Sequence, residues 1–217
     1  AIDSAQQAFK VWSKLSPTER RLRLLKAADL MDQKTEQFIE TGMQETGSTA
    51  TWYGFNVHLA ANMLREAAAM TTQIDGSLIP SDVPGNLAMG VRVPCGVIVG
   101  IAPWNAPVIL TTRALAMPLA CGNTVVLKAS EACPATHRLI GEVLHEAGLG
   151  EGVVNVITHA AEDAPQIVER LVSHPAVKRI NFTGSTHVGR IIAETAAKYL
   201  KPVLLELGGK APVIVLD

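Results

Sequence analysis

A single carboxylate, Glu206, lies near the end of the very apolar run 203–207 and just before Gly208 and Gly209. Ligands of α/β proteins bind outside the carboxyl ends of the strands, so a strand-end carboxylate can act on a ligand. An ionised carboxylate in apolar surroundings is costly unless it is paired or used. Two interpretations stay open, a general base that takes a proton from water or a thiol and a salt bridge with Lys210.

A carboxamide follows a second apolar run, because Trp104 and Asn105 lie between Pro103 and Pro107. Two prolines stiffen the loop, and the Asn105 amide can donate a hydrogen bond to a developing oxyanion. Trp104 taken alone is better explained as a packing residue.

Opposite charges follow a third run, where Lys128 and Glu131 flank Ser130. Lysine can donate to a ribose diol and glutamate can accept from it, and an acidic residue there disfavours a 2′-phosphate. The alternative is a solvated strand end.

Two glycines follow a fourth run, since Gly184 and Gly189 bracket the start of a predicted helix at Ser185 and Thr186. Free N–H groups at a helix N-terminus favour phosphate oxygens. The spacing matches the G-x-x-x-x-G half of a P-loop, but Arg190 and Ile191 replace its Lys-Ser/Thr pair. A glycine turn with a serine N-cap is an equally good explanation.

These groups need a scaffold, and short runs rich in Val, Ile and Leu supply its strands. The runs alternate with helical patterns, which predicts a Rossmann-like α/β fold with a parallel sheet covered by helices on both faces. The expected strands are 96–102, 124–128, 153–158, 178–182 and 203–207, and the expected helices between them are 107–120, 134–147, 162–173 and 186–200.

The first 75 residues form a helical lead. Ser16, Pro17 and Glu19 make a capping box, and the apolar stripe expected after it runs through Leu22, Leu25, Ala28, Leu30 and Met31. Residues 76–94 contain two extended runs around Pro84-Gly85, which predicts a protruding β-hairpin. An isolated hairpin is marginally stable, so we expect it to rest on a second subunit.

The composition narrows the function class. Of 217 residues, 48% are hydrophobic and the net charge is −1, so we expect neither a nucleic-acid nor a membrane partner. The three cysteines lack metal-ligand spacing, which favours free thiols in the cytoplasm and no metal site.

In this order and spacing, the motifs resemble the aldehyde dehydrogenase superfamily, and the overall sequence resembles its branch that acts on aromatic aldehydes such as salicylaldehyde and vanillin. The resemblance implies an NAD-binding domain over 1–75 and 95–210, a bridging oligomerisation hairpin at 76–94 and the start of a catalytic domain at 211–217. It also implies a nucleophilic cysteine a few tens of residues beyond Glu206, so we expect this chain to lack it.

The resemblance assigns roles by residue. Asn105 is the oxyanion-hole amide and Glu206 is the general base for thioester hydrolysis. The substrate residues are Trp52, Ile109 and Arg113. The NAD-binding residues are Ile101, Ala102, Pro103 and Trp104 near the nicotinamide, Lys128, Ser130 and Glu131 at the adenosine ribose, Phe182, Thr183, Gly184, Ser185, Val188 and Gly189 at the pyrophosphate and adenine, and Leu207 and Gly208 beside the nicotinamide.

The expected activity is NAD-dependent oxidation of an aldehyde to its carboxylic acid by a homodimer or homotetramer. Two alternatives stay open. One is a non-catalytic cofactor-binding and assembly module, and the other is a reductase of acyl phosphates or acyl-CoA. Reductases need no water-activating base, so Glu206 argues against the second alternative.

Overall fold

Strands and helices alternate from residue 97 onward, as the apolar runs predict. The computed structural model describes residues 1–216. The alternating elements are β3 (Val97–Ile101), α5 (Pro107–Ala120), β4 (Thr124–Lys128), α6 (Pro134–Glu146), β5 (Val154–Ile157), the 3₁₀ turn η1 (Ala161–Asp163), α7 (Ala164–Ser173), β6 (Val177–Gly184), α8 (Thr186–Lys198) and β7 (Val203–Leu207).

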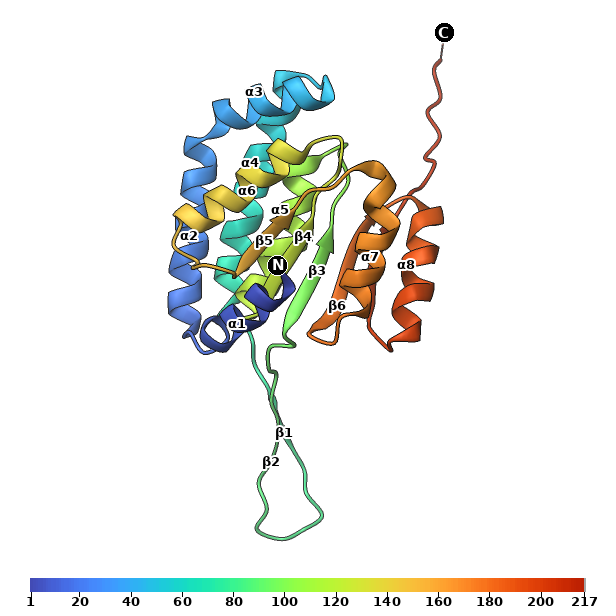
Figure 1. Cartoon of the computed structure of the whole chain (residues 1–217). Helices are drawn as coiled ribbons and strands as arrows, with labels where there is room; N and C mark the ends of the chain where they lie inside the picture. The colour runs from blue at the N-terminus through green and yellow to red at the C-terminus, as the bar shows by residue number, and fades with distance from the viewer. Residues whose placement is uncertain (217) are drawn as a thin grey trace.

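The five strands form one parallel sheet in the order β5-β4-β3-β6-β7. The order turns at β3, since β4 and β5 extend the sheet to one side and β6 and β7 to the other (Figure 1). Such a turning point is where open α/β sheets bind ligands, outside the carboxyl ends of the strands. The predicted α/β class is therefore confirmed.

Alternating side chains give the sheet two different faces. On one face, Ile98, Val125 and Leu127 pack against α5 and α6. On the other face, Val99, Val126 and Ile180 pack against the α7 and α8 side. Since successive strand residues point to opposite faces, each predicted site residue can be assigned to one side of the sheet.

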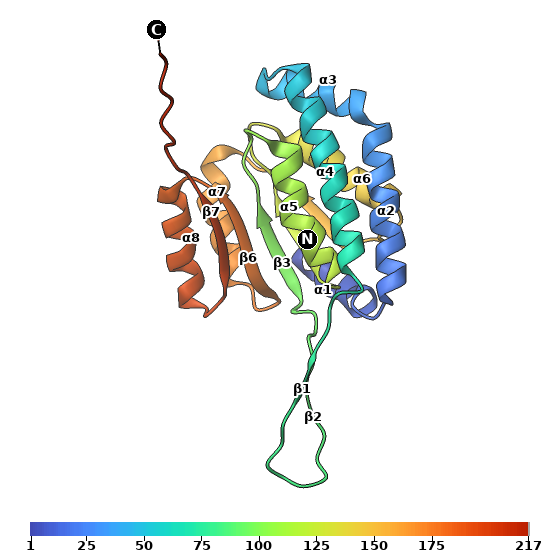
Figure 2. The same ribbon diagram turned by 180° about the vertical axis from the view of Figure 1, so that it is seen from behind.

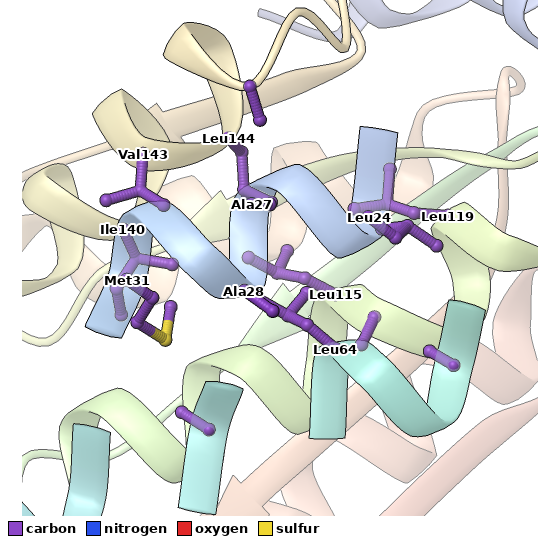
Figure 3. Close-up of a cluster of buried hydrophobic side chains, with 14 of the residues drawn as sticks. Leu24, Ala27, Ala28, Met31, Leu64, Leu115, Leu119, Ile140, Val143 and Leu144 are labelled. Carbon is purple, nitrogen blue, oxygen red and sulfur yellow. The ribbon is translucent and has the colours of Figure 1, made fainter. Parts of the chain in front are cut away.

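The helical lead adds an outer layer to the α5 and α6 side. Its helices are α1 (Ile2–Trp12), α2 (Pro17–Gln33), α3 (Thr35–Thr46) and α4 (Ala50–Met70). Figure 3 shows the aliphatic core that α2, α4, α5 and α6 share. Its labelled side chains are Leu24, Ala27, Ala28, Met31, Leu64, Leu115, Leu119, Ile140, Val143 and Leu144.

The predicted capping box is present, with the Ser16 hydroxyl accepting from the Glu19 N–H and the Glu19 carboxylate accepting from the Ser16 N–H. The apolar stripe predicted for the helix that follows this capping box is wrong at Leu22, because the Leu22 side chain is exposed. The buried residues of α2 begin instead at Arg20 and Leu24. The Arg20 guanidinium donates to the Ala120 carbonyl, so a cation, which the pattern of apolar residues omits, lies on the buried face of α2.

The hairpin projects from the body of the molecule on two long arms (Figures 1 and 2). Its paired parts are short, with β1 (Ser77–Ile79) antiparallel to β2 (Ala88–Gly90). Apolar side chains on the arms are exposed, among them Leu78, Leu87, Met89 and Val93. The predicted protruding hairpin is thus present, and its surface is more apolar than that of a free hairpin needs to be.

Candidate active site

One row of paired residues crosses the carboxyl end of the sheet. Pairing aligns Ile157 with Lys128, Lys128 with Ile101, Ile101 with Phe182, and Phe182 with Leu205. Every predicted chemical motif begins at this row or just beyond it. The parallel sheet therefore brings Asn105, Lys128, Gly184 and Glu206 to one edge, although they span about half the chain.

At the end of β4, Lys128 lies almost entirely inside the protein. Its side chain is 8% exposed, and its Nζ donates to the Ala129 carbonyl at 3.1 Å and lies 3.9 Å from the Glu131 carboxylate. Burial lowers the pKa of Lys128, and the Glu131 carboxylate opposes that shift. The structure thus holds a donor beside an acceptor, where the sequence left a solvated strand end open as the alternative.

At the start of α8, the Ser185 hydroxyl accepts from the Val188 N–H at 3.2 Å, so Ser185 is the N-cap of the helix. A β-carbon at Gly184 would lie 2.5 Å from the Phe182 ring, and one at Gly189 would lie 2.5 Å from Leu207. A larger residue at either position would have to displace the end of the Phe182 or Leu207 side chain. Val188 is exposed beside it.

In the loop after β3, Trp104 and Asn105 are exposed and Ala102 is buried. The Trp52 indole N–H, which comes from α4, donates to the Asn105 backbone carbonyl at 3.0 Å. Phe55, one turn after Trp52, stacks on it with ring centroids 5.6 Å apart. The predicted substrate residue Trp52 and the predicted oxyanion residue Asn105 are thus directly connected.

Glu206 projects from the face of β7 opposite to α8. It lines a cavity of about 960 Å³ together with Arg113, Asn181 and Leu204. The Arg113 guanidinium donates to the Thr183 hydroxyl at 3.2 Å, and Thr183 pairs with Glu206 in the ladder. The ion pairs found within residues 1–216 do not include Glu206, so the salt bridge with Lys210 is absent from the described part.

Comparison with known proteins identifies the family to which this chain belongs. The sequence profile of the aldehyde dehydrogenase family matches residues 1–217. The chain belongs to the aldehyde dehydrogenase family. The suspected resemblance is therefore confirmed, and the helices and parallel sheet match those of solved members of the family.

Several similar proteins are named for the aldehyde on which they act. A vanillin dehydrogenase from Pseudomonas fluorescens is 69% identical over the whole chain, which covers 45% of that protein. A salicylaldehyde dehydrogenase from Pseudomonas putida G7, solved with salicylaldehyde, is 52% identical with a TM-score of 0.96, and the match covers 100% of this chain and 45% of that one. An NAD-dependent benzaldehyde dehydrogenase from Corynebacterium glutamicum is 35% identical with a TM-score of 0.92, covering 97% and 45%. The chain thus spans about half the length of the relatives it matches.

The remaining predicted residues divide between core and surface. Within this family member, Ile101, Ile109 and Phe182 are buried, so their side chains stabilise the sheet edge and offer little surface to a ligand. Pro103 is half-buried, and Leu207 and Gly208 are exposed at the end of β7. The segment expected to begin another domain, 211–217, is irregular over 211–216, and Asp217 lies outside the described residues.

The donors at the sheet edge fit a dinucleotide. Lys128 and Glu131 present a cation and an anion to one point, as a ribose diol needs. The α8 N-terminus, at the end of β6 two strands away along the same edge, is a setting that favours phosphate. Within residues 1–216, no group of His, Cys, Asp and Glu side chains is arranged to hold a metal ion. Across the same residues, no helix is both long and apolar enough to cross a membrane.

One buried pair at this edge was not predicted. Cys133 is the N-cap of α6 and His137 lies in its first turn, with the thiol 3.6 Å from the His137 Nε2, and both are buried. Burial raises the pKa of Cys133 to about 12 and lowers that of His137 to about 4. The two are four residues apart, a spacing that places them on one helix face, and this spacing was the available signal.

Proposed function

We propose that the enzyme containing this chain oxidises an aromatic aldehyde to its carboxylic acid with NAD, and that this chain binds the cofactor. One observation carries the proposal. The row from Lys128 through Ile101 and Phe182 to Leu205 sets a ribose-type donor pair, an exposed carboxamide and a strand-end carboxylate along one edge. The names of the relatives, which include vanillin, salicylaldehyde and benzaldehyde dehydrogenases, support the same substrate class.

NAD rather than NADP is favoured by Glu131. Its carboxylate lies 3.9 Å from Lys128 Nζ, so the lysine charge is already partly balanced. A 2′-phosphate would meet the Glu131 carboxylate, whereas a free 2′-hydroxyl would donate to it. The name of the Corynebacterium relative, an NAD-dependent benzaldehyde dehydrogenase, points the same way.

The chemical roles follow from exposure and position. NAD, when bound, accepts the hydride of the aldehyde. The Asn105 amide donates to the oxygen on which negative charge develops. A cysteine thiolate, which the family places beyond Glu206, attacks the carbonyl carbon, and Glu206 takes a proton from the water that cleaves the resulting thioester.

Aromatic specificity rests on the α4 and α5 side of the edge. Trp52 and Phe55 form a stacked pair beside Asn105, and the exposed Arg113 lies on α5 one turn after the buried Ile109. Stacked rings give an apolar wall for an aromatic ring. Arg113 is exposed and can orient a ring hydroxyl while it bonds to Thr183.

The proposal includes assembly and location. The arms of the hairpin at 76–94 expose Leu78, Leu87 and Val93, and apolar surface of this kind favours contact with a second subunit in a homodimer or homotetramer. Cys95, Cys121 and Cys133 are all free, as is typical of the cytoplasm.

The test is NADH formation by the complete enzyme with vanillin and salicylaldehyde, with acetaldehyde as the matched aliphatic control. We expect a higher kcat/KM for the aromatic aldehydes with NAD. Cofactor binding without turnover of any aldehyde would favour the assembly module. Oxidation of NADH by an aromatic acyl-CoA, without the aldehyde reaction, would favour the reductase.

A further inference from the structure

The peptide unit between Ala129 and Ser130 is held at both ends. Its N–H donates to His137 Nδ1 at 3.1 Å. Its carbonyl accepts from Lys128 Nζ at 3.1 Å and lies 3.2 Å from His159 Nε2. The carbonyl and the N–H of a peptide unit lie in one plane, so His137 on one side fixes where the carbonyl points on the other.

The His137 ring has a defined protonation state. Nδ1 accepts from the Ser130 N–H, so the single proton of the neutral ring is on Nε2. That side of the ring faces the Cys133 thiol at 3.6 Å. His137 therefore connects the start of α6 with the loop after β4, which carries the proposed ribose-binding residues.

The first turn of α6 holds the ring in place. The Glu45 carboxylate, from α3, accepts from the Ala135 and Thr136 N–H groups at 2.7 and 2.8 Å and from the Thr136 hydroxyl at 2.6 Å. His137 is fully buried, and Ser130 is 5% exposed. Without an acceptor at Nδ1, the Ser130 N–H would be buried and unpaired, a state that proteins avoid by rotating the peptide or admitting water.

We propose that His137 is a positioning residue for cofactor binding, which acts through the Ala129–Ser130 peptide to aim the Lys128 ammonium at the ribose. The inference rests on the proposed function, since it deepens the role given to Lys128. His137 itself contacts no ligand. Removing its acceptor should let the peptide turn, and Lys128 should then lose the carbonyl that holds it.

The experiment is a calorimetric titration of the protein with NAD. His137→Leu removes the acceptor and should raise the Kd about tenfold. His137→Asn places a carboxamide oxygen where Nδ1 was, and it should keep the Kd within about threefold of the parent. His145→Leu removes an exposed histidine from the same helix without touching the peptide, so it should leave the Kd unchanged.

A double-mutant cycle separates positioning from a general structural role. In a Lys128→Met background, His137→Leu should change the Kd by less than about twofold, because the group it aims is gone. The Ser130 amide should exchange faster with solvent in His137→Leu than in His137→Asn. A tenfold loss that persists in the Lys128→Met background, or an equal loss in both His137 variants, would overturn the inference. A parent protein that binds no NAD would overturn the proposed function itself and the inference with it.

Discussion

The two sides of the sheet edge are built differently. At the end of β4, beside α6, Lys128 and Ser130 are buried, and the bond that fixes their loop joins residues seven apart in sequence. At the ends of β6 and β7, beside α5, Glu206 and Arg113 are exposed, and the Arg113–Thr183 bond joins residues 70 apart. The ribose side is thus closed and local, and the side of the proposed chemistry is open and made from distant segments.

The contacts on each side therefore determine which task that side can perform. The proposed ribose-binding pair, Lys128 and Glu131, is held by one loop and one helix, so it is in place once β4 and α6 pack. Glu206, beside the exposed Leu204, has no polar partner of its own among the ion pairs of residues 1–216. Binding should therefore tolerate changes on the open side, whereas chemistry should depend on them strongly.

The largest effect should come from Glu206→Gln in the complete enzyme. Glutamine keeps the size of the side chain but cannot take a proton from water. General-base help is typically worth about 10²–10⁴-fold, so steady-state turnover should fall by that factor. Hydride transfer precedes deacylation, so rapid mixing should still show a burst of NADH close to the enzyme concentration, and the Kd for NAD should not change.

Glu194→Gln is the matched control, since Glu194 is an exposed carboxylate on α8. It should leave both the burst and the turnover intact. Loss of the burst in Glu206→Gln would mean that Glu206 acts earlier, on the thiol. Unchanged turnover would show that Glu206 has a structural role and that the open side of the sheet edge does not supply the general base.

The second-largest effect should be on the free energy of unfolding, and it comes from the buried His137. Burial lowers the pKa of His137 from 6.5 to about 4, with the Lys128 charge adding to the shift. Between these values the unfolded chain binds a proton that the folded chain does not. The free energy of unfolding should therefore fall as pH drops through this window, by up to about 3 kcal/mol.

Urea unfolding at pH 7 and pH 5 measures this effect. His137→Asn removes the titrating ring, so its stability should fall less over the same interval. Equal losses in the parent and in the variant would show that His137 is already protonated in the folded protein, and the ring could not then accept from Ser130.

The alternation of apolar runs and helical patterns along the sequence predicted most of the fold. The strands 124–128 and 203–207 match β4 and β7. Strand β6 extends to Gly184, past the predicted end at 182, because Thr183 and Gly184 pair with Glu206 and Leu207, which only the neighbouring strand provides. Helix α7 begins at Ala164 rather than 162, where Pro165 fits its first turn.

At the candidate site, the sequence predicted groups but not the bonds between them. Lys128 and Glu131 are close in the chain, so their proximity was predictable. The bond from Trp52 to Asn105 crosses 53 residues and depends on how α4 packs on α5. The spacing of Cys133 and His137 was visible in the sequence, but the bond from the Ser130 N–H to His137 was not, because residue types do not reveal a backbone donor.

A smaller effect should distinguish the cofactors. Glu131→Gln removes the negative charge beside Lys128 and keeps an acceptor for the ribose hydroxyl. The preference for NAD over NADP, measured as the ratio of kcat/KM values, should narrow about tenfold, or about 1.4 kcal/mol. Glu142→Gln, an exposed glutamate on α6, should leave the ratio unchanged. A complete enzyme that prefers NADP would contradict this role for Glu131.

The smallest effect should come from Trp52→Phe, which keeps a ring but removes the N–H that donates to the Asn105 carbonyl at 3.0 Å. A hydrogen bond of this kind is worth about 0.5–1.5 kcal/mol net, so kcat/KM should fall about fivefold. The loss should be similar for vanillin and acetaldehyde, because the Asn105 amide serves the carbonyl oxygen of both, and the KM for NAD should not move. Phe55→Leu is the control that removes the stacked ring and keeps the N–H. It should reduce activity only with the aromatic aldehyde. If Trp52→Phe lowers kcat/KM for vanillin but not for acetaldehyde, then Trp52 acts only as a wall for the substrate ring. The bond to the Asn105 carbonyl would then contribute nothing to the orientation of the amide.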